Sequence, residues 1–224
     1  MKNELGHKHK LINDLRALLN SEASSEEVEI LYDATVEGER RWMNLLSYFN
    51  FMLVENPAVL LIGEAPGYRG TSISGVPFLS EQMIREREAQ QNNKLPLIEY
   101  IASSNYDSKT GYEATSTAMW DAIDSVHSQM PLLWAVFPNH PHILNNTDSN
   151  RKPRKSEISK YVDSIKILEK IYNIKEIVAV GNVAYETLVN SGYIVNKIRH
   201  PARGGSKIFK EGYRKIMEGY RGKD

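Results

Sequence analysis

Hydrophobic residues recur at steps of three and four positions between residues 42 and 53, and this spacing predicts a helix with one apolar face. The face consists of Trp42, Leu45, Leu46, Phe49, Met52 and Leu53. Upstream, Ser24 and Glu27 have the spacing of a capping box, in which each side chain bonds to a free amide at a helix start. We therefore expect the first fifty-odd residues to be helical, with the apolar face turned toward the core.

From residue 58 the pattern changes to short apolar runs of strand length, separated by turn residues and helical stretches. The predicted strands cover residues 58–62, 132–137, 176–180 and 194–198, and the predicted helices between them cover 81–90, 115–127, 156–173 and 182–190. This alternation predicts an α/β protein whose parallel sheet is covered on both faces. Ligands of such sheets bind at the carboxyl ends of the strands, so the loops after Ile62, Phe137, Val180 and Ile198 are expected to carry the chemistry.

The chain has 224 residues, which is the size of one large domain. We expect one structural unit made of a helical segment (residues 1–56) packed on an α/β domain (residues 57–224). Lys and Arg together number 28, as do Asp and Glu, so no overall charge indicates nucleic acid or membrane as the partner. The absence of cysteine excludes disulfides, thiolate metal sites and cysteine nucleophiles.

The start of the chain lacks the long apolar stretch of a secretory signal, and no later segment approaches the roughly 20 apolar residues of a membrane helix. These patterns predict a cytoplasmic protein that does not associate with membranes, and we expect it to be a monomer. His140 and His142 flank Pro141 and suggest a two-histidine metal site, but no third ligand with the required spacing accompanies them. We therefore expect no metal, with both histidines at the rim of a pocket.

Three loop motifs are expected to lie at the same edge of the sheet. GEAPG (residues 63–67) follows the first predicted strand, GVPF (75–78) closes the same loop, and HPARGG (200–205) follows the fourth strand. GEAPG is neither a Walker loop nor a dinucleotide fingerprint, and alone it is also typical of a simple strand-ending turn. Because the carboxyl ends of parallel strands meet at one edge, the three motifs together predict a single pocket.

Four ordered motifs, GEAPGYRG (63–70), GVPF (75–78), NRKP (150–153) and RHPARGG (199–205), resemble those of the uracil-DNA glycosylase superfamily, in particular the bacterial and archaeal branch with a GEAPG-type first motif. The resemblance covers about residues 58–217. It implies a three-layer α/β/α fold with a four-stranded parallel sheet. It also implies hydrolysis, during DNA repair, of the N-glycosidic bond of a flipped uracil or other deaminated base. Since the chain has no cysteine, it lacks the iron–sulfur cluster of some members, and no cofactor is expected.

The resemblance also implies roles for individual residues. Phe78 would stack on the extruded base, His200 and the backbone amides of residues 63–67 would donate hydrogen bonds to a uracil oxygen, and Glu64 would position the attacking water. The implied substrate-binding residues are Gly63, Ala65, Pro66, Gly67, Phe78, Ala135 and Asn139. The implied DNA-binding residues are Arg151, Pro201, Arg203, Gly204, Gly205 and Lys207.

One departure from the family pattern affects base recognition. Relatives carry an asparagine that reads uracil where this chain has Ala135, whose side chain cannot form a hydrogen bond. Asn139, four residues later, is a candidate replacement. The departure leaves a second interpretation open, a catalytically weak or inactive glycosylase-fold protein that binds DNA. A third interpretation is a nucleotide or small-molecule hydrolase whose motif match is accidental.

Charge is distributed unevenly along the chain. Residues 22–39 contain seven acidic residues and no lysine or arginine, so DNA is expected to bind elsewhere. Residues 199–223 contain eight basic and two acidic residues, and residues 151–155 contain four basic ones. These two segments predict a basic border around the pocket that binds phosphates in a salt-dependent way.

Overall fold

Four parallel strands form the central sheet of the computed structural model, which describes residues 2–89, 113–126 and 129–220. The strands are β2 (Val59–Gly63), β3 (Leu132–Ala135), β5 (Glu176–Val180) and β6 (Asn196–Ile198), in the spatial order β3-β2-β5-β6. Leu61 on the central strand β2 lies opposite Leu133 on one side and Val178 on the other. All five residues of β2 are buried, as expected for a strand covered on both faces. The predicted α/β class and four-stranded parallel sheet are confirmed.

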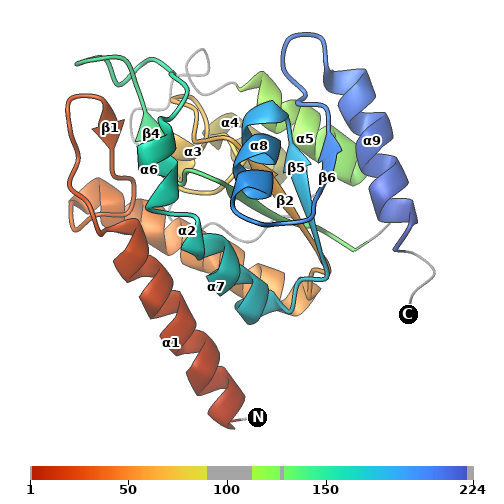
Figure 1. Cartoon of the computed structure of the whole chain (residues 1–224), viewed down its shortest axis with the longest axis horizontal. Coiled ribbons are helices and arrows are strands. Elements are labelled where there is room, and N and C mark those ends of the chain that lie inside the picture. Colours follow the sequence, from red (N-terminus) through yellow and green to blue (C-terminus); the bar gives the residue numbers. More distant parts are fainter. Residues whose placement is uncertain (1, 90–112, 127–128, 221–224) are drawn as a thin grey trace.

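Helices cover both faces of this sheet in a three-layer α/β/α arrangement. They are α1 (Lys2–Leu19), α2 (Val36–Glu55), α3 (Thr71–Ser74), α4 (Glu81–Ala89), α5 (Ala114–Asp124), α6 (Lys155–Ser159), α7 (Asp163–Tyr172), α8 (Asn182–Asn190) and α9 (Ser206–Glu218). Helices α5 and α9 pack together on one side of the sheet, while α7 and α8 lie on the other side and α1 packs on α7 (Figure 1). None of the described helices is long and apolar enough to cross a membrane.

The segment before the sheet is helical only in part. Helix α2 contains the predicted apolar face, but it begins at Val36, where the Thr35 side chain accepts a hydrogen bond from the Gly38 N–H. The predicted capping box at Ser24 and Glu27 is wrong. Ser24 Oγ instead accepts the Ile30 N–H in a turn that leads into β1 (Val28–Glu29), and β1 pairs antiparallel with β4 (His140–Pro141).

Most predicted boundaries agree with the structure to within a few residues, and β5 and α8 have the predicted bounds. The helix predicted over residues 156–173 is interrupted at residues 160–162, which separate α6 from α7. The predicted helix ends at Gln90 and His127 lie outside the described residues. The core is continuous across the chain, because Leu15 and Leu19 of α1 and Phe49 of α2 belong to the same buried cluster as the β2 side chains.

Candidate active site

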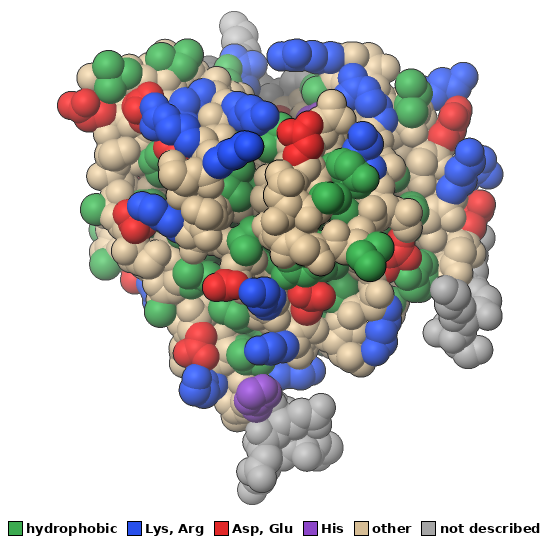
Figure 2. Space-filling view, viewed as in Figure 1, with side chains coloured by type: hydrophobic (Ala, Val, Ile, Leu, Met, Phe, Trp, Pro, Cys, Tyr) green, Lys and Arg blue, Asp and Glu red, His purple; other side chains and the backbone are tan. Residues whose placement is uncertain are grey.

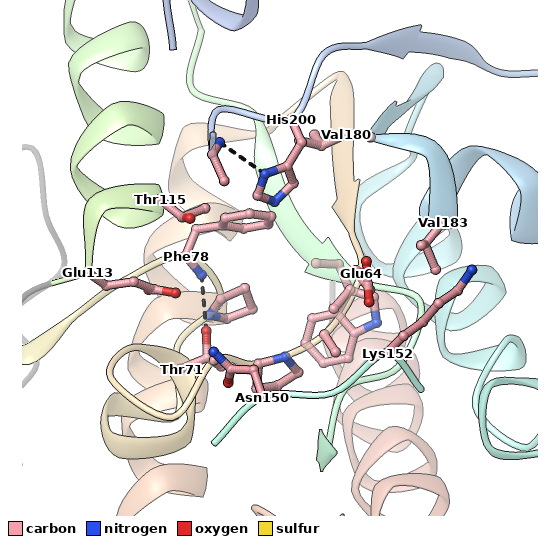
Figure 3. A pocket seen from close by; sticks show the side chains of 18 of the residues that line it. Glu64, Thr71, Phe78, Glu113, Thr115, Asn150, Lys152, Val180, Val183 and His200 are labelled. Atoms are coloured by element: carbon pink, nitrogen blue, oxygen red, sulfur yellow. Dashed lines mark hydrogen bonds between the residues drawn. The ribbon is translucent and has the colours of Figure 1, made fainter. Parts of the chain in front are cut away.

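A cavity of about 610 Å³ opens at the carboxyl ends of the strands (Figure 3). Its wall includes residues of the GEAPG, GVPF and HPARGG motifs, so the three motifs meet as the sequence predicts. Of the predicted catalytic and substrate-binding residues, Glu64, Ala65, Pro66, Gly67, Phe78, Ala135 and His200 line the cavity, and of the predicted DNA-binding residues Arg151 and Arg203 do. Gly63 lies directly behind the cavity wall, against Phe78.

The ring of Phe78 is held in the cavity by a strained backbone. Phe78 has a φ of 56°, a left-handed conformation that costs energy for a bulky residue. Its N–H donates to Thr71 Oγ1 at 3.2 Å, and its carbonyl accepts from Trp120 Nε1 at 2.9 Å. A Cβ atom on Gly63 would lie 2.3 Å from Phe78 Cζ, so only glycine leaves room for the ring. The fold therefore fixes the position of this aromatic surface before any ligand binds.

His200 reaches the cavity from the loop after β6, with a defined tautomer. The Ala202 N–H donates to His200 Nδ1 at 3.1 Å, as drawn in Figure 3, so Nδ1 is the acceptor and the ring hydrogen sits on Nε2. Burial lowers the pKa of His200, and the nearby charge of Arg199 lowers it further. The site therefore holds a neutral imidazole whose Nε2–H is available as a hydrogen-bond donor.

Glu64 is a half-buried carboxylate on the cavity wall immediately after β2. Burial raises its pKa, and the positive charge of Lys152 partly offsets this effect. The backbone of this segment is fixed by the two residues that follow β3, because the N–H of Val136 donates to the Gly63 carbonyl and the N–H of Phe137 donates to the Glu64 carbonyl. Glu64 is thus a carboxyl group with elevated basicity, which is the property of a residue that orients or activates water.

A second carboxyl group, Glu113, lines the cavity just before α5. A Cβ atom on Gly70 would lie 1.9 Å from Glu113 Oε2, and one on Gly67 would lie 2.8 Å from Oε1. Two of the three glycines of the first motif therefore make room for this carboxyl group. Burial raises the pKa of Glu113, while a hydrogen bond of 2.5 Å from Ser116 Oγ to Oε2 acts in the opposite direction.

Ala135 lies at the cavity wall, but Asn139 does not replace the missing amide. Asn139 is fully buried away from the cavity; its Oδ1 accepts the Leu31 N–H at 3.0 Å and its Nδ2 donates to the Leu19 carbonyl at 3.4 Å. Its amide is therefore used to attach the N-terminal segment to the sheet. The expectation that Asn139 reads the base is not supported by this geometry.

Arg151 is also used inside the protein. Its NH2 and NH1 groups donate to the two carboxylate oxygens of Glu157 at 2.7 and 2.8 Å, and NH2 also donates to the Glu27 carbonyl at 3.0 Å. Arg154 pairs with Glu27 and Glu157 as well. The acidic segment thus lies beside the basic one, because β1 pairs with β4. Tyr32, from the same segment, even lines the cavity.

Replacing Arg151 by alanine is expected to lower the free energy of unfolding by about 2 kcal/mol, because hydrogen bonds to a partly buried Glu157 are lost. Urea unfolding measures this change, with exposed Lys155→Ala as the control. Burial acts to raise the pKa of Glu157, but hydrogen bonds from Arg151 and the Arg154 backbone outweigh it and lower the pKa. The contribution of the Arg151–Glu157 pair to folding stability should therefore be fully present above the ordinary pKa of Glu. It should be lost as the pH falls through the lowered pKa of Glu157. If Arg151→Ala left the folding stability unchanged but weakened DNA binding, Arg151 would instead have the DNA-binding role that the sequence predicts.

The loop after His200 divides into buried and exposed residues. Arg203 and Gly204 are exposed, as is Lys207 at the start of α9, so these three are accessible to a large ligand. Pro201 and Gly205 are buried, and a Cβ on Gly205 would lie 2.1 Å from the His200 carbonyl oxygen. Gly205 therefore serves the packing of the loop. Lys and Arg side chains gather over the upper part of the molecule, where the loops after β4 and β6 lie (Figure 2).

His140 and His142 are buried and do not line the cavity, so the expectation that they lie at its rim is wrong. Nδ1 of His140 lies 2.9 Å from the Pro66 carbonyl oxygen and Nε2 lies 2.9 Å from the Thr147 carbonyl oxygen. His140 thereby connects the first motif to the loop after β4. Within the described ranges, no group of three or more His, Asp or Glu side chains is arranged to hold a metal ion.

Several cavity residues were given no individual role in the sequence analysis. They are Tyr32, Thr71, Pro77, Glu113, Thr115, Trp134, Pro138, Asn150, Lys152, Val180, Gly181, Asn182, Val183, Arg199 and Ala202. The residues after Val180 and Ile198 belong to loops that the strand pattern did indicate, and Asn150 and Lys152 belong to the NRKP motif. Tyr32 and Glu113 come from segments without any such signal, and only long-range packing brings them to the cavity.

No protein-family model and no curated protein matches the chain. Among solved structures, the chain is similar to the crystal structure of wild-type Pedobacter heparinus SMUG2, with a TM-score of 0.60 and 12% sequence identity. The match covers 94% of this chain and 97% of that chain, so it includes the N-terminal helical segment as well as the sheet. At this identity the similarity shows a shared fold.

Proposed function

We propose that the protein is a DNA glycosylase that hydrolyses the N-glycosidic bond of uracil or another deaminated base extruded from DNA. The observation that carries this proposal is the meeting of the fixed Phe78 ring and the neutral His200 imidazole in one cavity at the sheet edge. The fold shared with Pedobacter heparinus SMUG2 and the four ordered motifs support it further.

In this proposal the extruded base stacks on Phe78, since an aromatic ring binds the face of any base. Cleavage of the glycosidic bond leaves negative charge on the departing base, and a preorganised donor near a base oxygen lowers the barrier. His200 Nε2–H supplies that donor without transferring a proton. Glu64 orients the water that attacks the sugar carbon. No metal or organic cofactor enters these steps.

The DNA strand would follow the cationic residues at the cavity mouth. Lys152, Arg199 and Arg203 line the cavity from the loops after β4 and β6, and Lys207 is exposed beside them. Arg203 has a left-handed φ of 54° on an exposed turn three residues after His200. These residues would contact phosphates and fill the gap left by the base, so binding should weaken as salt rises.

The test is an excision assay on oligonucleotides that carry one uracil, hypoxanthine or xanthine, in single and double strands. Alkali should cleave the DNA at the abasic site after incubation with the protein, and the signal should decrease with rising salt. An oligonucleotide with the parent base at the same position is the control. Absence of cleavage with all three bases would contradict the proposed reaction.

Ala135 favours a second candidate, a glycosylase-fold protein that binds DNA with little or no catalysis. Replacing Ala135 by asparagine distinguishes the two. A large gain in uracil excision by this variant, starting from negligible wild-type activity, would identify a disabled but otherwise intact pocket. Wild-type activity that the substitution leaves unchanged or lowers would instead show that another group already recognises the base.

A further inference from the structure

Base recognition in this cavity needs a polar group that Ala135 does not supply. A buried nucleobase edge must find hydrogen-bond partners, because an unpaired polar atom is costly and a paired one gives strong discrimination. Several polar groups of the wall are already engaged. Tyr32 Oη donates to the Gly75 carbonyl and Thr71 Oγ1 accepts the Phe78 N–H.

Glu113, which lines the cavity, is a candidate for this polar group. Its carboxyl group points from the residue before α5 into the space beside Phe78 and Thr71 (Figure 3). Ser116 Oγ donates to Oε2, whereas no hydrogen bond from the described part of the chain reaches Oε1. The carboxyl group lies against the backbone of the first motif, since a Cβ atom on Gly67 would lie 2.8 Å from Oε1 and one on Gly70 would lie 1.9 Å from Oε2.

The Ser116 contact also indicates which oxygen carries the hydrogen when the group is neutral. An oxygen that accepts a hydrogen bond is best served as the carbonyl oxygen of a carboxylic acid, so Oε2 takes that role and Oε1 becomes the O–H donor. Burial raises the pKa of Glu113 and so favours this neutral form. The packed neighbours of the carboxyl group on the first-motif loop and on α5 are Gly67, Gly70 and Ser116. The other titratable or charged groups of the cavity wall are Tyr32, Glu64, Arg151, Lys152, Arg199, His200 and Arg203.

We propose that Glu113, in its neutral form, donates a hydrogen bond from Oε1 to the carbonyl oxygen that deamination creates on an extruded base. Deamination replaces an amino group by a carbonyl oxygen, as in the change from cytosine to uracil or from adenine to hypoxanthine. A donor at this point accepts the deaminated base and rejects its parent, whose amino group is itself a donor. An ionised Glu113 would have the reverse preference, since a carboxylate accepts from the cytosine amino group.

This inference rests on the proposed glycosylase function and names the residue that selects the substrate. Two variants separate base recognition from folding. Glu113→Gln keeps the size and an N–H donor but cannot ionise, and Glu113→Ala removes the donor. Exposed Asp121→Asn, on the same helix, is the matched control for loss of an acidic residue. Thermal unfolding of each variant establishes that it is folded.

Excision of uracil from DNA and binding of free uracil and free cytosine are both measured from mildly acidic to mildly alkaline pH. Glu113→Ala should lower the excision rate by about 10²-fold, as for removal of one positioned donor, and should abolish the preference for uracil over cytosine. Wild-type uracil binding should fall as Glu113 ionises, while Glu113→Gln should show no such fall. Ser116→Ala should move the wild-type decline to higher pH, because the Ser116 hydrogen bond acts to lower the pKa of Glu113.

The two kinds of failure are distinguishable. Excision by the wild type that neither Glu113 variant alters, with unchanged uracil preference, would overturn the role of Glu113 and leave the glycosylase function intact. Binding of free uracil that depends on Glu113, without excision of any base, would support the recognition role and contradict the proposed reaction. A wild type that neither binds uracil nor cleaves uracil DNA would overturn both.

Discussion

Replacing His200 by alanine is expected to lower the rate of base excision by about 10²- to 10³-fold, the usual effect of removing one preorganised donor from developing negative charge. The structure gives the reason, because the Ala202 N–H bonds to Nδ1 and leaves Nε2–H as the donor. Single-turnover excision with saturating protein isolates the chemical step. His9→Ala, on an exposed position of α1, is the matched control. A full rate in His200→Ala would remove His200 from the mechanism.

The same residue predicts a pH dependence. Burial, followed by the charge of Arg199, lowers the pKa of His200 below its ordinary value of 6.5. Protonation would place a hydrogen on Nδ1 against the Ala202 N–H, so the wild type should lose activity only when pH falls through the lowered pKa. The unfolded chain takes up this proton first, so folding stability should decline from about pH 6.5 down to the lowered pKa. In urea unfolding measured across this acidic pH range, His200→Ala should not show the part of the decline in folding stability that arises from His200.

Replacing Gly63 by alanine is expected to displace the Phe78 ring, since the new Cβ would lie 2.3 Å from Cζ. Overpacking of this kind costs about 1–3 kcal/mol of stability. Loss of base stacking costs a further ~1–3 kcal/mol in substrate binding, which corresponds to about 5- to 150-fold in kcat/KM. Urea unfolding and steady-state excision measure the two effects.

The double variant Gly63→Ala with Phe78→Ala tests whether the effect of Gly63→Ala arises from a clash with the Phe78 ring. If the ring is what the new methyl group strikes, Gly63→Ala should have little further effect once the ring is absent, so the two changes will be far from additive. Gly6→Ala, in a helix with open space around the Cα atom, serves as the control and should be neutral or slightly stabilising. Additive effects would show that Gly63 is required for a reason other than room for Phe78.

Local sequence patterns were sufficient to predict strands and helices where these elements depend on residues close together in the chain. The apolar run at residues 176–180 and the helix at 182–190 have the predicted bounds because burial on both faces and turn residues at the ends act over a few positions. The capping-box interpretation of Ser24 and Glu27 failed because β1 pairs with β4, more than a hundred residues away. A spacing of three residues carries no information about such a partner.

The residues of the candidate site also show the difference between what the sequence predicts and what the tertiary structure decides. Gly67 is one of the substrate-binding residues that the resemblance implies, yet the structure gives the space beside Gly67 and Gly70 to Glu113. Asn139 and Arg151 have the residue types expected of base and phosphate contacts. Their hydrogen bonds to Leu31 and Glu157 use them inside the protein instead.

The sequence by itself determined the four strands of the parallel sheet, their alternation with helices and the placing of three motifs at one sheet edge, because hydrophobic periodicity and parallel connections follow from the chain's own geometry. Only the tertiary structure decided which polar groups remain free to bind a ligand. That choice depends on partners brought together from distant segments: Leu31 for Asn139, Glu27 for Arg151 and Gly75 for Tyr32. Each partner sets whether a side chain donates, accepts or is already paired, and spacing along the sequence contains none of that information.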